Sequence, residues 1–216
     1  MKTENLTVSP SPHIRSSMTT SKIMGYVLIA LVPATVASVV IFGLRALVLI
    51  AFCAATAVVW ERLSNYIMKK PSSVGDLSAV VTGVILAFNL PVTLPLWMAA
   101  IGTFVAIVVV KQLFGGLGQN FANPAVVGRI VLMLSFPSAM NSWVQPFYNG
   151  ADVITTATPL ATGEATYSDL FLGTTGGCLG EVCAFALILG GLYLYAMDII
   201  SPATPLAFMG TVVAFS

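Results

Sequence analysis

Two acidic residues stand immediately before long apolar segments, where a charge is costly. Asp76 precedes the charge-free stretch 77–110, and Glu181 precedes the apolar stretch that begins at Val182. Ionisable side chains at membrane depth usually have a function, because placing them there costs free energy. A carboxylate can also stabilise a helix N-terminus, whose free N–H groups carry partial positive charge. Two roles therefore stay open for each residue: helix capping, or handling a cation, with a cofactor contact as a further role for Glu181.

A polar, glycine-rich segment interrupts the apolar pattern between Gly115 and Pro124. Its glycines disfavour a continuous helix, whereas Pro124 suits the first turn of a new one. The N-terminus of that helix offers free N–H groups to a ligand, and Asn120 and Asn123 add amide groups beside it. The segment predicts a ligand site or an asparagine cap at a loop. Asn123-Pro124-Ala125 also occurs in aquaporin-type channels, which pair two such half-helices where this chain shows one.

A threonine-rich stretch runs from Asp152 to Leu160 and includes Thr155 and Thr158. Thr158 precedes Pro159, and a residue before proline is biased to extended backbone, which leaves its hydroxyl accessible. By composition alone this is an ordinary polar loop.

The remaining reactive side chains indicate no chemistry of their own. The one histidine, His13, lies in a polar leader, and no serine-nucleophile motif is present, so hydrolase chemistry is not indicated. The three cysteines lie in apolar runs without CxxC spacing and are interpreted as small hydrophobic residues. Glu61 and Arg62 are interpreted as a structural ion pair at the membrane interface.

Composition indicates what must position these residues. Of 216 residues, 57% are hydrophobic and 8% are charged, against about 25% charged in soluble domains. The net charge of +1 gives no basic surface for nucleic acid, so no such partner is expected. The sequence predicts an all-α polytopic membrane protein with about seven transmembrane or half-spanning helices. They are expected at 23–44, 46–70, 77 to about 90, a segment after Pro95 to about 114, 124 to about 136, 182–197 and from 203 onward.

Lysine and arginine positions predict the orientation of the chain. With the N-terminus inside and the segments alternating, Arg45 is the single one of the nine basic residues that falls outside. The loop 138–177 then lies outside and contains no lysine or arginine. The basic residues inside or at the inner membrane face are Lys2, Arg15, Lys22, Arg62, Lys69, Lys70, Lys111 and Arg129.

Taken together, these motifs resemble RnfD, the flavin-carrying membrane component of Rnf complexes, which is similar to NqrB, its counterpart in the sodium-translocating NADH:quinone reductase. The matching segments, in family order, are Ser11-Pro12-His13, Asp76 to Gly83, Gly115 to Asn120, Asn123 to Ala125, Asp152 to Leu160, and Gly177 to Glu181. The resemblance implies a component of a prokaryotic cytoplasmic-membrane pump that couples ferredoxin oxidation and NAD⁺ reduction to Na⁺ or H⁺ transport. Other Rnf subunits and membrane lipid are the implied partners. A channel or solute transporter built on the broken helix at Asn123 is the alternative.

The resemblance also implies two flavins. FMN is expected to be attached through its phosphate to Thr158, in a motif that includes Thr155 and Asp152, by a flavin transferase that works outside the cytoplasm. Thr156 replaces the glycine frequent in the family. Non-covalent riboflavin is expected at Asn120 and Asn123. The flavins would lie near opposite membrane faces and pass electrons between them, since the chain has few groups of its own for redox chemistry.

The family has roughly ten helices in two inverted halves, which divides this chain into four expected regions. They are a cytoplasmic leader at 1–22, a five-helix repeat at 23–137 with its glycine-rich break at 115–124, an outer flavinylation loop at 138–177, and the start of a second repeat at 178–216. Because the chain ends within an apolar segment, the second repeat is expected to be incomplete. Asp76 and Glu181 remain candidates for the ion path.

Overall fold

A computed structural model of the chain describes residues 18–70, 73–147, 166–181 and 183–215. Its two longest helices are α1 (Thr20–Phe42) and α2 (Leu44–Ile67). At 1.5 Å per residue each is about 35 Å long, enough to cross a hydrocarbon layer of about 30 Å. Length and apolar composition qualify these two helices as candidate membrane spans. Gly43 separates them with a φ of 74°, a left-handed value at which glycine carries no steric penalty.

Three shorter helices follow, joined by the breaks that the sequence predicts. The 3₁₀ turn η1 (Val74–Asp76) leads into α3 (Ser78–Phe88), which at 11 residues is too short to span. After Pro91 and Pro95 the chain forms α4 (Leu96–Phe104), which continues as the π-helix η2 (Val105–Gln112). Beyond the glycine-rich segment, α5 (Pro124–Ser135) begins at the expected proline.

The expected loop at 138–177 is partly helical. The short helix α6 (Pro137–Met140) follows α5 directly, because Pro137 at its first position presets the helical φ. Helix α8 (Tyr167–Leu172) lies near the other end and stops at Gly173, whose φ is 93°. Residues 148–165 of that loop lie outside the described ranges. Two apolar helices complete the order, α9 (Ala184–Ala196) and α10 (Ala203–Phe215).

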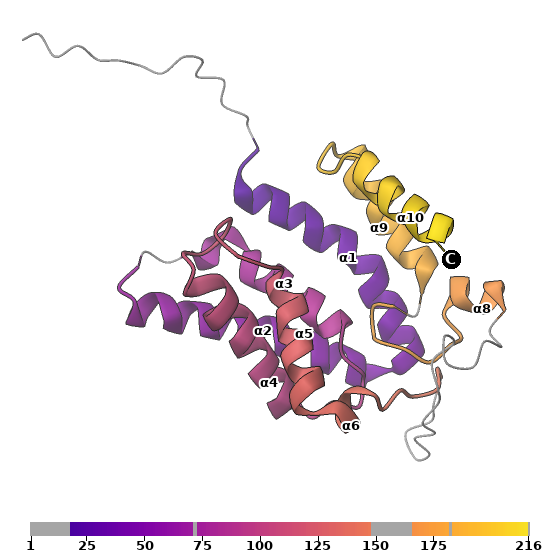
Figure 1. Ribbon diagram of the computed structural model, residues 1–216, viewed down its shortest axis with the longest axis horizontal. Coiled ribbons are helices and arrows are strands. Elements are labelled where there is room, and N and C mark those ends of the chain that lie inside the picture. The colour runs from indigo at the N-terminus through magenta and orange to yellow at the C-terminus, as the bar shows by residue number, and fades with distance from the viewer. Residues whose placement is uncertain (1–17, 71–72, 148–165, 182, 216) are drawn as a thin grey trace, which may run out of the picture.

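Small residues let the helices approach closely. A Cβ at Gly83 in α3 would lie 2.6 Å from the Cys53 carbonyl oxygen of α2, and one at Gly190 in α9 would lie 2.2 Å from the Ala30 carbonyl oxygen of α1. Such contacts are typical of membrane helix pairs, which associate by backbone proximity. Figure 1 shows the result: α1 crosses one side of the group α2–α5, and α9 packs beside α1. Cys53 and Cys178 are buried and Cys183 is half-buried, which agrees with their interpretation as small hydrophobic residues.

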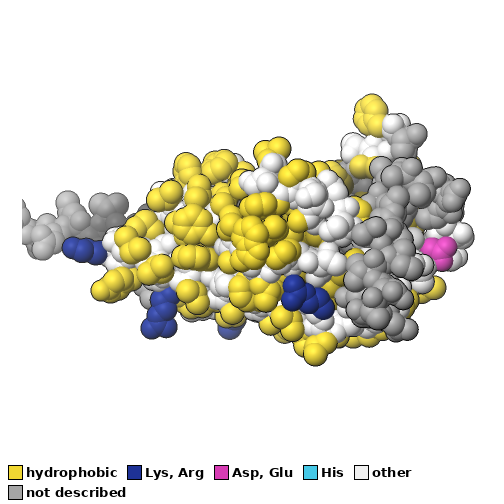
Figure 2. Space-filling view, turned by 90° about the horizontal axis from the view of Figure 1, so that it is seen from below, with side chains coloured by type: hydrophobic (Ala, Val, Ile, Leu, Met, Phe, Trp, Pro, Cys, Tyr) yellow, Lys and Arg dark blue, Asp and Glu magenta, His cyan; other side chains and the backbone are white. Residues whose placement is uncertain are grey.

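The surface of this bundle is apolar. Figure 2 shows hydrophobic side chains over most of the visible face. Exposed residues of α1, α2, α9 and α10 include Val40, Leu44, Leu192 and Phe215, and every described residue of α10 is exposed. This surface fits a hydrocarbon environment, which confirms the predicted all-α membrane class.

Two opposite ends can be defined on the bundle. At the basic end, near Lys22, Lys69 and Lys70, Ser21 Oγ donates to the Gly75 carbonyl at 2.8 Å. At the Gly43 end, Arg45 Nη2 donates to the Leu94 carbonyl at 3.0 Å and Phe147 N–H to the Ile41 carbonyl at 2.9 Å.

Candidate functional site

The glycine-rich segment is irregular, as predicted. Gly115, Gly116 and Gly118 have φ values of 121°, 101° and 85°, which an L-residue rarely adopts. Asn123 is the N-cap of α5, and its side-chain oxygen accepts from Ala125 N–H at 3.0 Å. The capping role for Asn123 is therefore confirmed. Asn120 differs, because its Oδ1 is buried and has no hydrogen-bond partner among the described residues.

Asp76 also performs the capping role that the sequence left open. Its Oδ1 accepts from the N–H of Ser78, the first residue of α3, at 2.8 Å, and from the Ser78 hydroxyl. The same hydroxyl accepts from Lys111 Nζ. Asp76 is half-buried, and the Ser78 hydroxyl connects it to Lys111 at the end of η2.

The interpretation of Glu61 and Arg62 as an interfacial pair is wrong. Glu61 is fully buried, at 0% exposure, and Arg62 is exposed. Glu61 Oε1 instead pairs with Lys111 Nζ at 2.6 Å, and Lys111 is itself 1% exposed. Neighbouring residues on a helix point about 100° apart, so Glu61 can face the bundle while Arg62 faces outward.

A network of neutral donors completes this pair. Gln112 Nε2 donates to Glu61 Oε1 at 2.8 Å, and Ser73 Oγ donates to the same oxygen at 3.0 Å. Asn65 Nδ2 in turn donates to Ser73 Oγ at 2.9 Å. Together with Ser78 of α3 and Asp76 of η1, these side chains of α2, η2 and the turn before η1 join five segments at the basic end. We call Glu61, Lys111, Gln112, Ser73, Ser78 and Asp76 the Glu61 cluster.

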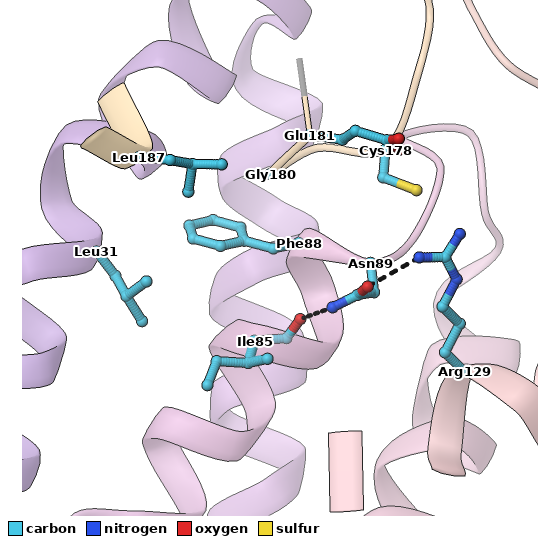
Figure 3. A pocket seen from close by; sticks show the side chains of 9 residues that line it. All are labelled: Leu31, Ile85, Phe88, Asn89, Arg129, Cys178, Gly180, Glu181 and Leu187. Carbon is cyan, nitrogen blue, oxygen red and sulfur yellow. Dashed lines mark hydrogen bonds between the residues drawn. The ribbon is translucent and has the colours of Figure 1, made fainter. Parts of the chain in front are cut away.

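Glu181 does not cap the helix that follows it. Helix α9 begins after Cys183, and its N-terminus receives no capping hydrogen bond from a side chain of the described residues. Glu181 instead lines a pocket of about 340 Å³ together with Cys178 and Gly180 of its own loop. Gly180 N–H donates to the Phe88 carbonyl at 2.9 Å, which fixes this loop against the end of α3. Figure 3 shows the loop residues above Phe88 and Asn89.

Arg129 is a pocket residue that the sequence assigned to the inner membrane face. It lies in the middle of α5, half-buried, and its Nη1 donates to Asn89 Oδ1 at 2.9 Å (Figure 3). Asn89 Nδ2 is itself held by the Ile85 carbonyl at 2.8 Å. Among the described residues, no carboxylate lies within ion-pair distance of this guanidinium. A cation in the middle of an apolar segment could have indicated this site in the sequence.

Three predicted site residues lie outside the described ranges, Asp152, Thr155 and Thr158, and so does His13. Within residues 18–70, 73–147, 166–181 and 183–215, no cluster of three metal-ligating side chains is present.

Comparison with known proteins identifies relatives over nearly the whole chain. The chain is 48% identical over 221 aligned residues to the D-subunit of the Na⁺-translocating ferredoxin:NAD⁺ oxidoreductase complex of Acetobacterium woodii. The alignment covers 98% of this chain and 69% of that protein. It is 41% identical to the proton-translocating counterpart of Clostridium ljungdahlii, with the same coverage of both chains. It is 36% identical to the D-subunit of the ion-translocating oxidoreductase complex of Rhodobacter capsulatus, covering 95% of this chain and 67% of that one. Residues 7–216 match the family described as NQR2, RnfD, RnfE, and the chain belongs to that family.

Proposed function

We propose that this chain is the RnfD-type membrane component of an ion-translocating ferredoxin:NAD⁺ oxidoreductase, the Rnf complex. The observation that carries the proposal is the alignment of 98% of the chain with two proteins so described, at 48% and 41% identity. One of these relatives is named for Na⁺ and the other for protons, so their names support either ion. The partners are the other subunits of the complex, membrane lipid and a flavin transferase.

FMN attached to the Thr158 hydroxyl through its phosphate is the first part of this function. Support comes from the motif Asp152-x-x-Thr155-Thr-Ala-Thr158 and from the absence of lysine and arginine between 138 and 177. That absence favours the outer side of a prokaryotic cytoplasmic membrane, with the N-terminus inside. The Gly43 end would then face outward and the basic end inward.

Riboflavin held beside the glycine-rich segment is the second part. The fit rests on Asn120, whose buried Oδ1 lacks a partner among the described residues, because such an acceptor costs free energy unless a ligand donor satisfies it. Imide and ring N–H groups of an isoalloxazine are donors of this kind. Asn123 contributes less directly, since its oxygen already caps α5, but its amide NH₂ remains available for a ring carbonyl.

The flavins supply the electron chemistry when bound, and the chain's own residues position them. Asn120 orients the ring edge. Asn123 fixes the N-terminus of α5, against which the ring lies. The Glu61 cluster fixes the end of η2, from which the glycine-rich segment starts. Asp76 and Glu181 are the acidic candidates for the ion path, at the basic end and in the pocket respectively.

Fluorescence of the chain after denaturing electrophoresis tests the attachment. In the complex purified with its full-length subunits, the unaltered chain should fluoresce and Thr158→Ala should not, while Thr155→Ala should retain part of the signal. Mass spectrometry of the Thr158 peptide should show one added FMN. A fluorescent Thr158→Ala chain contradicts the attachment. The broken helix at Asn123 favours one alternative, a channel, which predicts solute flux from the reconstituted chain without flavin.

A further inference from the structure

The C-terminal end of α2 presents two consecutive lysines whose backbone is fixed by hydrogen bonds. Lys69 N–H donates to the Tyr66 carbonyl at 3.2 Å, and Lys70 N–H donates to the Asn65 carbonyl at 2.9 Å. With Lys69 in the left-handed conformation at a φ of 51°, these bonds form the Schellman motif that ends many helices. Both lysines are exposed. The motif therefore holds two consecutive cations at the surface of the basic end.

Lysine is not the residue that this backbone favours. Glycine is usual at the left-handed position of the motif, because a side chain there costs free energy. The charge of Lys69 offsets part of this cost through the helix dipole. Lys70 lies beyond the helix, and its Nζ donates to the Gln112 carbonyl at 3.2 Å, so the described residues use one of its three donors. The chain thus keeps a cation where glycine would fold more easily, and a second cation beside it with two donors left for an acceptor.

The acidic side chains of the basic end do not neutralise these lysines. Glu61 is fully buried inside the Glu61 cluster, and Asp76 is half-buried and bonded to the first residue of α3. Lys22 and Arg62 are exposed and add to the positive charge. Asp198 is exposed as well, but it follows α9, which packs on α1 and has no contact with α2 among the described helices. The surface around the end of α2 therefore attracts an anion.

An apolar strip leads along α2 to the two lysines. Val59, Leu63 and Ile67 are spaced four residues apart, so they lie on one side of the helix, and all three are exposed. Tyr66 is 82% exposed in the last turn, where a tyrosine suits the boundary between hydrocarbon and headgroups. Figure 2 shows basic side chains at one end of a largely hydrophobic face. A matching ligand has an anionic head and a hydrocarbon body.

We propose that the end of α2 binds an anionic phospholipid, whose phosphate pairs with Lys69 and Lys70 and whose acyl chain lies along Leu63 and Val59. Lipid phosphate supplies the charged acceptors that ammonium groups bind, and each basic residue at a membrane surface contributes about a fivefold preference for anionic lipid. An acidic segment of another protein would match the lysines but not the apolar strip, which favours the lipid. The proposal depends on neither flavin and on neither orientation of the chain.

Photo-crosslinking of the complex in lipid nanodiscs tests this site. The complex, purified with its full-length subunits, is placed in phosphatidylcholine discs that contain a small fraction of one of two probes. The probes are phosphatidylglycerol and phosphatidylcholine, each with the same diazirine near the glycerol end of one acyl chain. Mass spectrometry of chymotryptic peptides locates the label. We expect phosphatidylglycerol to label the end of α2 at least about tenfold more than phosphatidylcholine does, since two lysines contribute to the preference.

Three variants separate charge from structure. Lys69→Gly removes a cation and relieves the left-handed backbone, so the labelling preference should fall about fivefold while the helix end still folds. Lys70→Gln should lower the preference by a similar factor, and the two substitutions together should bring phosphatidylglycerol close to the level of phosphatidylcholine. Arg45→Gln is the matched control, because it removes one cation at the opposite end of the bundle, where Arg45 donates to the Leu94 carbonyl. It should leave labelling at the end of α2 unchanged.

Each remaining outcome contradicts the proposal. Equal labelling by the two probes in the unaltered complex would show that this surface does not select anionic lipid. A preference that survives the double substitution would place the phosphate away from Lys69 and Lys70. A crosslink from the end of α2 to another subunit, in place of lipid, would show that protein covers the lysines. A loss of stability in Lys69→Gly with an unchanged preference would leave Lys69 a role at the helix end alone.

Discussion

The Glu61 cluster and the Arg129 pocket are two ways of holding a charge inside the same apolar bundle. In the cluster, Lys111 meets a carboxylate at 2.6 Å, and Gln112 and Ser73 donate to the same oxygen. In the pocket, Arg129 has the Asn89 amide at 2.9 Å and a cavity of about 340 Å³ beside it. We call the first arrangement closed, because groups of the chain itself satisfy its charges. We call the second open, because a cavity lies beside its charge.

The difference separates a structural role from a binding role. Removing a charge from water costs free energy that a partner must offset, and the cluster offsets it within the chain. It also joins α2, α3 and η2 at the basic end, where η2 leads into the glycine-rich segment. Arg129 leaves most of its donors without acceptors among the described residues, which favours an outside ligand. Even the cluster has one exception, because Glu61 Oε2 is buried without a partner among the described residues.

The largest expected effect comes from breaking the closed arrangement. Lys111→Met leaves the Glu61 carboxylate buried without its counter-charge, so the free energy of unfolding should fall by about 3–5 kcal/mol. Thermal denaturation of the detergent-purified complex, followed by helical circular dichroism, measures the loss. Arg62→Gln, on the exposed neighbour of Glu61, is the matched control and should change stability by less than about 0.5 kcal/mol.

The paired variant sharpens the comparison. Replacing both charges, with Glu61→Leu and Lys111→Met together, should restore much of the stability, because two apolar groups leave no charge uncompensated. If the double variant is as unstable as Lys111→Met, the cluster does more than balance its charges. If Lys111→Met is as stable as the unaltered chain, the closed description is wrong.

An intermediate effect is expected where α1 meets α9, at the wall of the open pocket. Gly190→Ala places a Cβ against the Ala30 carbonyl and should cost about 1–3 kcal/mol by overpacking. Gly191→Ala is its control, because nothing lies within 4 Å of that position, and alanine there should stabilise the helix by up to about 1 kcal/mol. Opposite signs in the same denaturation assay support the contact, and equal signs contradict it.

The position of α9 also affects the Arg129 pocket but not the Glu61 cluster. Leu31 of α1 and Leu187 of α9 both line the pocket, so Gly190→Ala should displace one of its walls. The Glu61 cluster lies on other helices, and the same substitution should leave the effect of Lys111→Met additive. Non-additive losses would show that the two regions are coupled.

Local patterns predicted much of the fold. Charge-free runs located α1, α2 and α9, and the prolines at 91, 95 and 124 located the breaks before α4 and α5. These features depend on residues close together in the chain. The helices α6 and α8 were missed, because each is a few residues long inside a stretch rich in proline, glycine and threonine.

The sites depended on contacts that no local pattern contains. Glu61 and Lys111 are 50 positions apart, and their pairing follows from the packing of α2 against η2. In the sequence, Arg62 is the cation nearest to Glu61. The pairing of these two residues is excluded only by the directions in which their side chains point. Arg129 was counted as one more inward cation for the same reason, since the membrane side of a residue does not specify which neighbours it faces. The Asn123 cap could be predicted from the sequence, because Asn123 lies within three residues of its donor partner.

The smallest effect distinguishes the two asparagines of the glycine-rich segment. Asn123→Ala removes the cap of α5 and should cost about 1 kcal/mol of stability. Asn120→Ala removes a buried acceptor that has no partner among the described residues, so stability should stay equal or rise slightly. The amount of riboflavin released from the denatured complex should fall more for Asn120→Ala than for Asn123→Ala, which is the reverse of the order expected for stability. Chromatography of the extracted flavins and thermal denaturation give the two readouts.

Because the cap and the unpaired acceptor lie three residues apart, general damage to the segment would lower stability and riboflavin together in both variants. A loss of stability without loss of riboflavin in Asn120→Ala would place the ligand away from this asparagine, and the segment would then be closed in the same sense as the Glu61 cluster.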